Sequence, residues 1–442
     1  MSSTEQPVRV EYVTDPAAAM SRLAVSDRFG EYVMYEQPDV WVFAADPLGS
    51  VELDAGELRT TWGGETTARA WSGSPATAID TALATLPIDG RNAYGWIGFE
   101  FCAYSLAATH HLNPLTSLAH LMIPRIEVRI DATGVRISGA TPNEACDIHD
   151  LISGSQGVDL PAPTPVDVRV DPTNYEERVA TAVAEIRSGS YQKVILSRKV
   201  ELPFAVDVPA TYRLGRANNT PARSFLLRLG GLEAAGFSPE LVASVDDDRV
   251  VTTEPLAGTR AFGLGAEADG AARAELLADP KEIVEHAISV QTSFAEIAEV
   301  AVPGTPAVSD FMAVRERGSV QHLASTVRGT LAADRTAWDA LEVLFPSVTA
   351  SGIPKRAGVD SVFRNDHDPR GLYSGAVVCV SPTGALEATL VLRAIYQTGE
   401  GAWLRAGAGI VGQSRPEREF EETCEKLGSV APYVVKAITA SP

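Results

Sequence analysis

The pattern of apolar and polar positions predicts a chain in which strands and helices come in irregular runs. Short apolar runs bounded by turn residues favour strands, whereas longer stretches with a helical repeat and capping residues favour helices. Strands are expected at residues 39–44, 93–101, 193–202, 224–229, 249–253, 307–315, 320–331, 372–380 and 388–396. Helices are expected at residues 76–86, 174–187, 280–300, 336–345 and 416–427. Because strands and helices do not alternate strictly, we expect an antiparallel α+β fold instead of a parallel sheet.

A proline-rich segment divides the chain. Four prolines fall between residues 161 and 172, a composition that cannot continue a helix or a central strand. We therefore expect an N-terminal part of the α+β body at residues 1–170, which carries no chemical motif. A catalytic part is expected at residues 171–442.

The charge balance argues against a nucleic-acid partner. The 442 residues include 37 Lys plus Arg and 57 Asp plus Glu, which gives a net charge of −20 at neutral pH. A phosphate backbone requires a basic surface, and no segment of this chain is locally basic. A nucleic-acid partner is therefore not expected.

Cysteine usage and hydropathy indicate a cytosolic protein. Cys102, Cys146, Cys379 and Cys424 form no C-x-x-C pair, and no histidine lies at metal-binding spacing from them. This pattern is typical of a reducing compartment and predicts no zinc site. The first residues lack the apolar core of a signal peptide, and no apolar run approaches the ~20 residues of a membrane span.

Two acidic pairs are candidate metal ligands. Glu282 and Glu285 share one face of a predicted helix, and Glu419 and Glu422 share a face of another. Taken alone, each pair is more typical of a solvated acidic surface, and Glu282 also fits a capping position after Asp279. If the two helices meet, their carboxylates would suit Mg²⁺, which prefers oxygen ligands.

Lys193 and Glu240 are candidates for acid–base chemistry. Lys193 begins an apolar strand, where a lysine is usually a strand end with its ammonium in water; an enclosed ammonium would instead be a candidate general base. Glu240 follows Pro239 and is either a loop carboxylate or a buried general acid. Neither functional reading is favoured by the local sequence alone.

Further polar positions are candidates for binding an anionic ligand. Gly258 and Thr259 lie in a turn that follows a strand, and Arg393 lies within an apolar run, where a guanidinium needs a carboxylate partner. Tyr373 has glycines on both sides at a distance of two residues, which allows close ligand approach but also suits a bend. Gly407-Ala-Gly409 lacks the third glycine and the βαβ context of a dinucleotide loop.

The order of the motifs is more specific than any one of them. In sequence they are Gln192-Lys-Val-Ile-Leu-Ser-Arg, Phe237-Ser-Pro-Glu-Leu, Glu254-Pro-Leu-Ala-Gly-Thr-Arg, Asp279-Pro-Lys-Glu-Ile-Val-Glu-His, Gly371-Leu-Tyr-Ser-Gly, Arg405-Ala-Gly-Ala-Gly-Ile and Glu419-Phe-Glu-Glu-Thr-Cys-Glu-Lys. From Tyr175 to about Tyr433 the chain resembles the chorismate-utilising enzymes, and within them the salicylate synthases of siderophore pathways.

The resemblance implies the fold of the anthranilate synthase component I family, with two antiparallel β-sheets packed together, helices outside and the site in a cleft between the sheets. It implies chorismate as substrate and Mg²⁺ held by Glu285 and Glu422, supported by Glu282 and Glu419. Lys193 would be the base that activates water at ring carbon 2, and Glu240 the acid that protonates the leaving hydroxyl at carbon 4. The residues implied to contact substrate are Gly258, Thr259, His322, Tyr373, Arg393, Gly407 and Lys426.

Three positions favour one sub-family over others. Lys193 stands where the ammonia-using enzymes have Gln, Ala257 stands where aminodeoxychorismate synthases carry a nucleophilic Lys, and Thr259 favours continuation from isochorismate to salicylate and pyruvate. The alternatives left open are an isochorismate synthase, an anthranilate synthase-type enzyme and a carboxylate-binding protein without catalysis. A monomer without a glutaminase subunit is expected.

Overall fold

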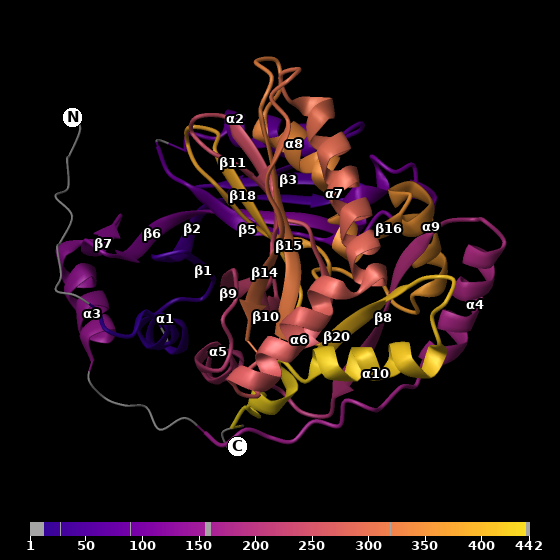
Figure 1. Cartoon of the computed structure of the whole chain (residues 1–442). Coiled ribbons are helices and arrows are strands. Elements are labelled where there is room, and N and C mark those ends of the chain that lie inside the picture. The colour runs from indigo at the N-terminus through magenta and orange to yellow at the C-terminus, as the bar shows by residue number, and fades with distance from the viewer. Residues whose placement is uncertain (1–12, 27, 89, 155–160, 319, 439–442) are drawn as a thin grey trace.

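The computed structural model describes residues 13–26, 28–88, 90–154, 161–318 and 320–438. Within these ranges the chain forms one body in which helices lie outside layers of antiparallel strands (Figure 1). The fold is thus antiparallel α+β, as the pattern of apolar positions predicts.

The first sheet runs in the order β7–β6–β2–β1–β9–β10–β19–β20–β8–β16. Its strands are β7 (Gly134–Ser138), β6 (Ser117–Asp131), β2 (Val40–Asp54), β1 (Tyr32–Gln37), β9 (Arg223–Leu229), β10 (Leu232–Ser238), β19 (Ala394–Thr398), β20 (Gly401–Ile410), β8 (Lys193–Leu202) and β16 (Gly352–Ile353). In this register Gly407 pairs with Ser197, and Lys193 pairs with Ile353.

The second sheet runs β4–β3–β2–β6–β5–β17–β18–β11–β12–β15–β14, and β13 also pairs with β15. Its additional strands are β4 (Glu65–Arg69), β3 (Leu58–Trp62), β5 (Ala93–Ile97), β17 (Ala376–Val380), β18 (Leu386–Leu390), β11 (Leu241–Val245), β12 (Val250–Thr253), β13 (Leu256–Ala261), β14 (Ala307–Arg317) and β15 (Val320–Thr330). The long strands β2 and β6 belong to both sheets and join them.

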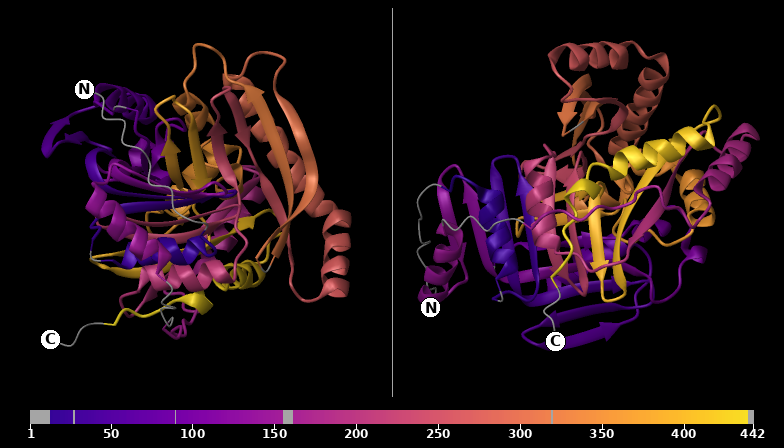
Figure 2. Two further views of the ribbon diagram at one scale, coloured as in Figure 1. Left: turned by 90° about the vertical axis from the view of Figure 1, so that its left-hand side faces the viewer. Right: turned by 90° about the horizontal axis from the view of Figure 1, so that it is seen from below.

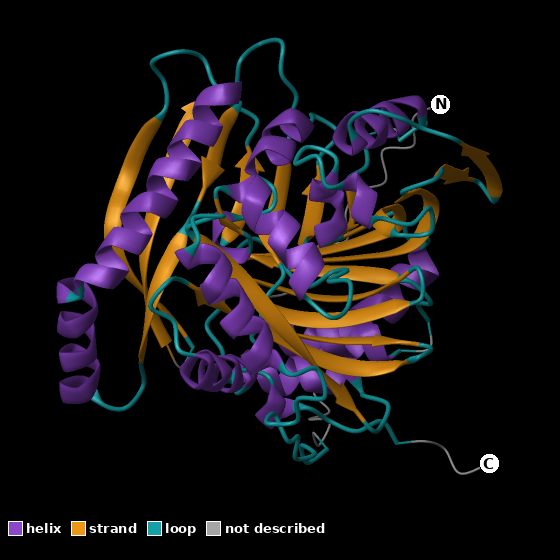
Figure 3. Cartoon of the chain, turned by 90° about the vertical axis from the view of Figure 1, so that its right-hand side faces the viewer, coloured by secondary structure: helices purple, strands orange, loops and turns teal. Residues whose placement is uncertain are grey.

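Helices cover the outer faces, as seen from the side in Figure 3. They are α1 (Pro16–Val25), α2 (Pro75–Thr85), α3 (Pro142–Ser153), α4 (Tyr175–Arg187), α5 (Val208–Ala217), α6 (Ala266–Ala278), α7 (Pro280–Val300), α8 (Ala337–Leu344), α9 (Lys355–Asn365) and α10 (Pro416–Leu427). Short 3₁₀ turns are η1 (Phe99–Ala103), η2 (Thr109–His111), η3 (Val348–Ala350) and η4 (Ala431–Tyr433). Helix α7 packs on β13 and β15, and α10 packs on β20. These two contacts place the acidic helices against opposite sheets.

Three predicted strands are wrong in extent because the backbone turns where the apolar run continues. The predicted strand 388–396 is two strands, β18 and β19, separated at Arg393, whose φ is 52°. The predicted strand 372–380 begins only at Ala376, after Ser374 with φ 60°. The predicted strand 93–101 ends at Ile97 and continues as η1. An apolar run indicates that a segment is buried. Because a buried turn is as apolar as a buried strand, the run does not show where the strand ends.

The two parts of the chain share their sheets. Strand β1 pairs with β9, and β5 pairs with β17, so N-terminal strands hydrogen-bond to strands that follow the proline-rich segment. Figure 2 shows the N-terminal and C-terminal strands in one body. No helix or strand occupies residues 161–174, in agreement with the expected break. The division into two parts at about residue 170 stays a prediction.

Two observations concern membrane-spanning helices and the state of the cysteines. No helix within the described residues is long and apolar enough to cross a membrane. Cys102, Cys146, Cys379 and Cys424 are all free thiols.

Candidate active site

The predicted site residues lie on both sheets and on the helices that cover them. Lys193 and Gly407 belong to β8 and β20 of the first sheet, whereas Gly258 and His322 belong to β13 and β15 of the second. Glu240 immediately precedes β11. Lys193 and Gly407, which are more than 200 positions apart in the sequence, lie on the paired strands β8 and β20.

Helices α7 and α10 carry the four predicted metal ligands. Helix α7 begins where expected because the Asp279 carboxylate accepts hydrogen bonds from the backbone N–H groups of Lys281 and Glu282, with Pro280 in the first turn. The Glu282 side chain does not cap the helix but accepts a hydrogen bond from Arg260 at 3.3 Å. The capping alternative for this carboxylate is thereby wrong.

Each of three glutamates pairs with a cation of the chain. The Lys193 ammonium lies 2.5 Å from Glu285 Oε1, Lys426 lies 2.8 Å from Glu422 Oε1, and Arg260 contacts Glu282. Both lysine partners are themselves predicted site residues. The two acidic pairs are therefore not a simple solvated surface.

The pKa values of the four carboxyls divide in two. Burial, followed by repulsion from a neighbouring glutamate, raises the pKa of Glu282; burial also raises that of Glu419, where repulsion from Glu422 adds to it. For Glu285 and Glu422 burial acts in the same direction, but their lysine partners outweigh it and the pKa is lowered. Repulsion from Glu422 on α10 is among the smaller influences that raise the pKa of Glu285 on α7.

This donor set fits a hard divalent cation. Four carboxylates offer only oxygen ligands, and Glu419 has no ion-pair partner among the described residues, whereas the other three each pair with one cation. In the described part of the chain, however, no three of the four carboxylates place ligand oxygens within 4.8 Å of one another. Instead, Lys193, Lys426 and Arg260 form ion pairs with three of the glutamates.

Lys193 is enclosed at the entrance of β8. Its side chain is only 8% exposed, so the alternative of a solvated strand end is wrong. Room for it is provided by Gly409 on β20, where an added Cβ would lie 3.2 Å from Lys193 Cε. The ammonium is directed at a carboxylate on the neighbouring helix and is not in bulk water.

Glu240 is fully buried among neutral donors. Its carboxyl accepts hydrogen bonds from Ser347 at 2.9 Å, Thr349 at 3.3 Å and the backbone N–H of Leu256 at 3.0 Å. Burial raises the pKa of Glu240 to about 8, although these donors pull it down. A carboxyl in this state carries a proton at neutral pH, as a general acid requires.

His322 links the glycine turn to Arg393. Its Nε2 accepts a hydrogen bond from the Arg393 guanidinium at 2.7 Å, and its Nδ1 lies 3.0 Å from the carbonyl oxygen of Gly258 and 3.1 Å from Thr259 Oγ1. Burial and the charge of Arg393 lower the pKa of His322 to about 3. The imidazole is therefore neutral and carries its hydrogen on Nδ1.

Arg393 has no carboxylate partner among the described residues, where its contacts are His322 and the carbonyl oxygen of Arg317 at 3.4 Å. Burial, then repulsion from Arg317, lowers the pKa of Arg393 to about 10. Arg393 lies at the break between β18 and β19, and its positive φ means that the backbone there is not in a strand conformation. Two neighbouring guanidinium groups without an internal anion fit a carboxylate ligand.

Tyr373, Gly407 and Lys426 form a second cluster at β20. The Lys426 ammonium donates a hydrogen bond to the Gly407 carbonyl oxygen at 2.9 Å. A Cβ on Gly407 would lie 2.6 Å from the Leu196 carbonyl oxygen and 3.0 Å from the Tyr373 hydroxyl, so a side chain is excluded here chiefly by the backbone of β8. The guanidinium groups of Arg370 and Arg405 lie over the Tyr373 ring at 5.7 and 5.5 Å.

Sequence reasoning missed several residues that build this site. Ser347 and Thr349 hold Glu240, Gly409 makes room for Lys193, Arg260 pairs with Glu282, and Arg317 supports Arg393. The segment from Pro346 to Pro354 is rich in Ser, Thr and Gly, which is a signal for a polar loop but not for its partner.

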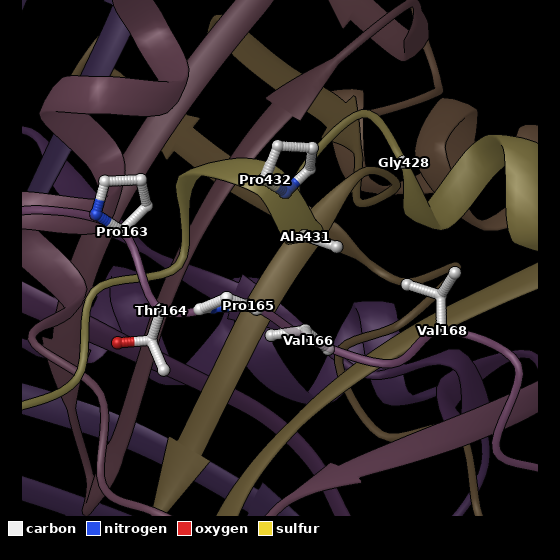
Figure 4. Close-up of a pocket in the computed structure, with 8 residues that line it drawn as sticks. All are labelled: Pro163, Thr164, Pro165, Val166, Val168, Gly428, Ala431 and Pro432. Carbon is white, nitrogen blue, oxygen red and sulfur yellow. The ribbon is translucent and has the colours of Figure 1, made fainter.

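A separate groove carries no ionisable side chain. It lies where the proline-rich segment meets the turn after α10, and its lining includes Pro163, Pro165, Val166, Ala431 and Pro432 (Figure 4). Without an acid, a base or a metal ligand it offers no chemistry. The site of interest is therefore the polar cluster between the sheets.

Comparisons with known proteins identify the family. The family model described as chorismate binding enzyme matches residues 30–432. A salicylate synthase of Mycolicibacterium paratuberculosis is 53% identical over 424 residues, which cover 95% of this chain and 94% of that protein.

Two solved structures share the fold at low sequence identity. Anthranilate synthase component I from Streptococcus pneumoniae superposes with a TM-score of 0.75 at 22% identity, covering 98% of this chain and 95% of the other. The menaquinone-specific isochorismate synthase from Escherichia coli superposes with a TM-score of 0.74 at 20% identity, covering 98% and 96%. From the extent of the family match and the identity to its relative, the chain belongs to the family of chorismate binding enzymes.

Proposed function

We propose that the protein is a Mg²⁺-dependent salicylate synthase. It converts chorismate to isochorismate by adding water at ring carbon 2 with loss of the carbon 4 hydroxyl, and then to salicylate plus pyruvate. The observation that carries the proposal is the 53% identity to a salicylate synthase over nearly the whole length of both chains. The contrast between Lys193 and Glu240 supports it independently, because the reaction needs one base and one acid.

Lys193 is the general base of the first step. As the neutral amine, its Nζ takes a proton from the attacking water, which is a poor nucleophile without such help, and becomes an ammonium that pairs with Glu285. Enclosure by Gly409 and contact with Glu285 hold this nitrogen in place. Because Lys193 stands in place of a glutamine, water is the nucleophile and ammonia is not.

Glu240 is the general acid of the same step. It gives its proton to the hydroxyl group that leaves carbon 4, and its pKa of about 8 means that the proton is present at neutral pH. Ser347 and Thr349 orient the carboxyl through their hydroxyl groups. Acid and base thus act on different ring carbons.

The remaining predicted residues bind the substrate. Arg393, with Tyr373, takes the enolpyruvyl carboxylate, since its guanidinium has no carboxylate partner among the described residues. The other substrate-contacting residues are Gly258, Thr259, His322, Gly407 and Lys426. In the second step a hydrogen moves within isochorismate itself, and these residues supply the conformation in which it moves.

Glu285 and Glu422 hold Mg²⁺, with Glu282 and Glu419 supporting it. When bound, the ion supplies positive charge for the ring carboxylate, which four carboxylates alone would repel.

Product analysis tests this function. Pure protein incubated with chorismate and Mg²⁺ is expected to release salicylate and pyruvate in equal amounts. Isochorismate that accumulates without pyruvate would instead identify an isochorismate synthase, the alternative favoured by the structural similarity to the Escherichia coli enzyme. No product from chorismate with or without Mg²⁺ would leave a carboxylate-binding protein.

A single chain without a glutaminase subunit is part of the proposal. Addition of ammonium salts should give no aminated product, since Lys193 occupies the nucleophile side. The monomeric state and the cytosolic location stay predictions.

A further inference from the structure

Two adjacent histidines and an aspartate meet away from the acidic helices. His110 and His111 lie in η2, and Asp360 lies in α9, 249 residues from His111 along the chain. His111 Nε2 is 3.0 Å from Asp360 Oδ1, and His110 Nε2 is 3.8 Å from the same oxygen. In the described ranges this is the one group of three or more metal-ligating side chains whose ligand atoms all lie within 4.8 Å of one another.

The spacing of these atoms matches a tetrahedral metal site. Zinc binds histidine nitrogen and carboxylate oxygen at about 2.0–2.2 Å, so neighbouring ligand atoms in a tetrahedron lie roughly 3.3 Å apart. The two distances to Asp360 Oδ1 lie on either side of that value. All three ligand atoms lie within 4.8 Å of one another, and an ion that binds them replaces the hydrogen bond between His111 and Asp360.

The surroundings orient the ligands and leave negative charge for a cation. Arg364 Nε donates to Asp360 Oδ2 at 3.0 Å, which leaves Oδ1 facing the imidazoles. Asp360 and Glu185 share the single positive charge of Arg364 in two ion pairs of 3.0 and 2.7 Å, so these three groups together carry one net negative charge. The His111 ring stacks on Phe363 with centroids 5.1 Å apart and planes 15° apart, which fixes its direction.

We propose that His110, His111 and Asp360 form a binding site for a first-row transition-metal ion, with Zn²⁺ as its representative. Imidazole nitrogens select such ions, whereas Mg²⁺ prefers a set made of oxygens alone. Three protein ligands leave a coordination position for water.

The site has a structural consequence. Residues His110 and His111 precede the proline-rich segment, and Asp360 follows it, so the ion cross-links the N-terminal part to the catalytic part. An ion that binds only the folded chain stabilises it. The proposal revises the expectation that the chain has no zinc site. Spacing within the sequence gives no sign of it, because two adjacent histidines acquire their third ligand only through folding.

Zinc titration tests the proposal on the full-length protein. Zn²⁺ is added in the presence of excess Mg²⁺, which occupies sites made of oxygen ligands, and binding is followed by competition with a zinc indicator. The wild type is expected to bind one Zn²⁺ that the His110→Ala/His111→Ala variant binds at least tenfold more weakly. Since loss of an outer partner alone costs about 10- to 100-fold in affinity, loss of two ligands is readily measured.

A matched control separates this site from ordinary surface histidines. His149 also lies beside an aspartate, with Nδ1 3.5 Å from Asp150, but within the described ranges the two are not part of a group of three ligand atoms that all lie within 4.8 Å of one another. The His149→Ala variant is expected to bind Zn²⁺ like the wild type and to show the same rise in melting temperature with Zn²⁺. The double variant should lose that rise.

Two outcomes would overturn the proposal. Equal zinc affinity in the wild type and the double variant would place the ion elsewhere. If the Asp360→Asn variant, which keeps the contact to Arg364, binds Zn²⁺ as tightly as the wild type, then Asp360 is not a ligand and the ion does not cross-link the two parts of the chain. Melting in a chelator checks that all variants fold, and turnover of chorismate is assayed separately, so failure here does not bear on the proposed activity.

Discussion

Lys193 and Glu240 are both buried, but their side chains have opposite electrostatic surroundings. Lys193 is paired with a charged carboxylate, Glu285, on a helix that carries further glutamates. Glu240 meets only neutral donors, two hydroxyl groups and one backbone N–H. Burial is common to both, and the difference lies in the charge of the partner.

This contrast separates an acid from a base within one fold. A buried carboxyl without a cation keeps its proton, which is why the pKa of Glu240 rises to about 8. A buried lysine beside a carboxylate can serve as a base, because the carboxylate stabilises the ammonium that forms when the amine accepts a proton. The experiments below break or sharpen this comparison, starting with the largest expected effect.

Removal of the base should have the largest effect. Lys193→Gln is expected to lower kcat for chorismate by several orders of magnitude, since general bases contribute about 10²–10⁴-fold and the variant also leaves Glu285 without its ammonium partner. Initial rates of pyruvate release measure this. Lys199→Gln, on the same strand but paired with exposed Glu201, should retain near-normal rates. Near-normal turnover of Lys193→Gln would remove it as the base.

Removal of the acid should cost somewhat less, because the leaving hydroxyl can take a proton from water. Glu240→Gln is expected to lower kcat roughly 10²- to 10³-fold. In the wild type, kcat/KM should fall as the pH rises through about 8, since the acid form is then lost. A Glu240→Gln variant that keeps this alkaline fall would assign it to another group. The control is Glu233→Gln, because Glu233 lies on β10 and pairs with Arg228 on β9.

The same variant should change stability with a defined sign. The folded protein holds the Glu240 proton up to about pH 8, whereas the unfolded chain releases it near the ordinary pKa of a carboxyl. Wild-type stability is therefore lost as the pH rises between these two values, by on the order of 1.4 kcal/mol per pH unit at most. Glu240→Gln should raise the free energy of unfolding relative to wild type more at pH 8 than at pH 5. Urea unfolding at both pH values measures the difference, and equal differences would contradict the buried, protonated state.

Loss of one hydroxyl donor should shift the pH profile with a moderate loss of rate. Thr349 lowers the pKa of Glu240 through its hydrogen bond, so Thr349→Val should move the alkaline fall of kcat/KM to higher pH and reduce kcat about tenfold. Thr253→Val removes a buried hydroxyl that bonds only the Val242 carbonyl and should leave the profile unchanged. An unshifted profile in Thr349→Val would show that the threonine does not act on Glu240.

The smallest effect is expected at the glycine beside the base. An added Cβ at Gly409 would come within 3.2 Å of Lys193 Cε, so Gly409→Ala should displace the ammonium by a few tenths of an ångström and lower kcat several-fold. Gly412→Ala, whose nearest neighbour would be 3.6 Å away, is the matched control. Equal rates in both variants would mean that a Cβ at position 409 does not displace Lys193 from its working position.

The sequence indicates the elements of the fold better than their limits. The bounds of β8, α7 and α10 are predicted correctly, because apolar periodicity and the capping residue Asp279 mark them. The break at Arg393 is not, since a positive φ within an apolar run leaves no trace in composition. Pairings such as β1 with β9 and β5 with β17 depend on contacts across the whole chain.

The site follows the same division. Ordered motifs point to Lys193, Glu240 and the glutamates, and the structure encloses Lys193 and buries Glu240. The partners that set their chemistry, among them Ser347 and Gly409, are ordinary residues in sequence. Their role comes from distances that only folding creates.

Oxygen labelling tests the central claim most directly. If water adds at ring carbon 2 and pyruvate leaves from carbon 3, the new hydroxyl remains in the product. Turnover of chorismate with Mg²⁺ in H₂¹⁸O should therefore give salicylate with one ¹⁸O in its phenolic hydroxyl, as read by mass spectrometry. Salicylate that forms without the label would contradict the addition of water and the pairing of Lys193 as base with Glu240 as acid.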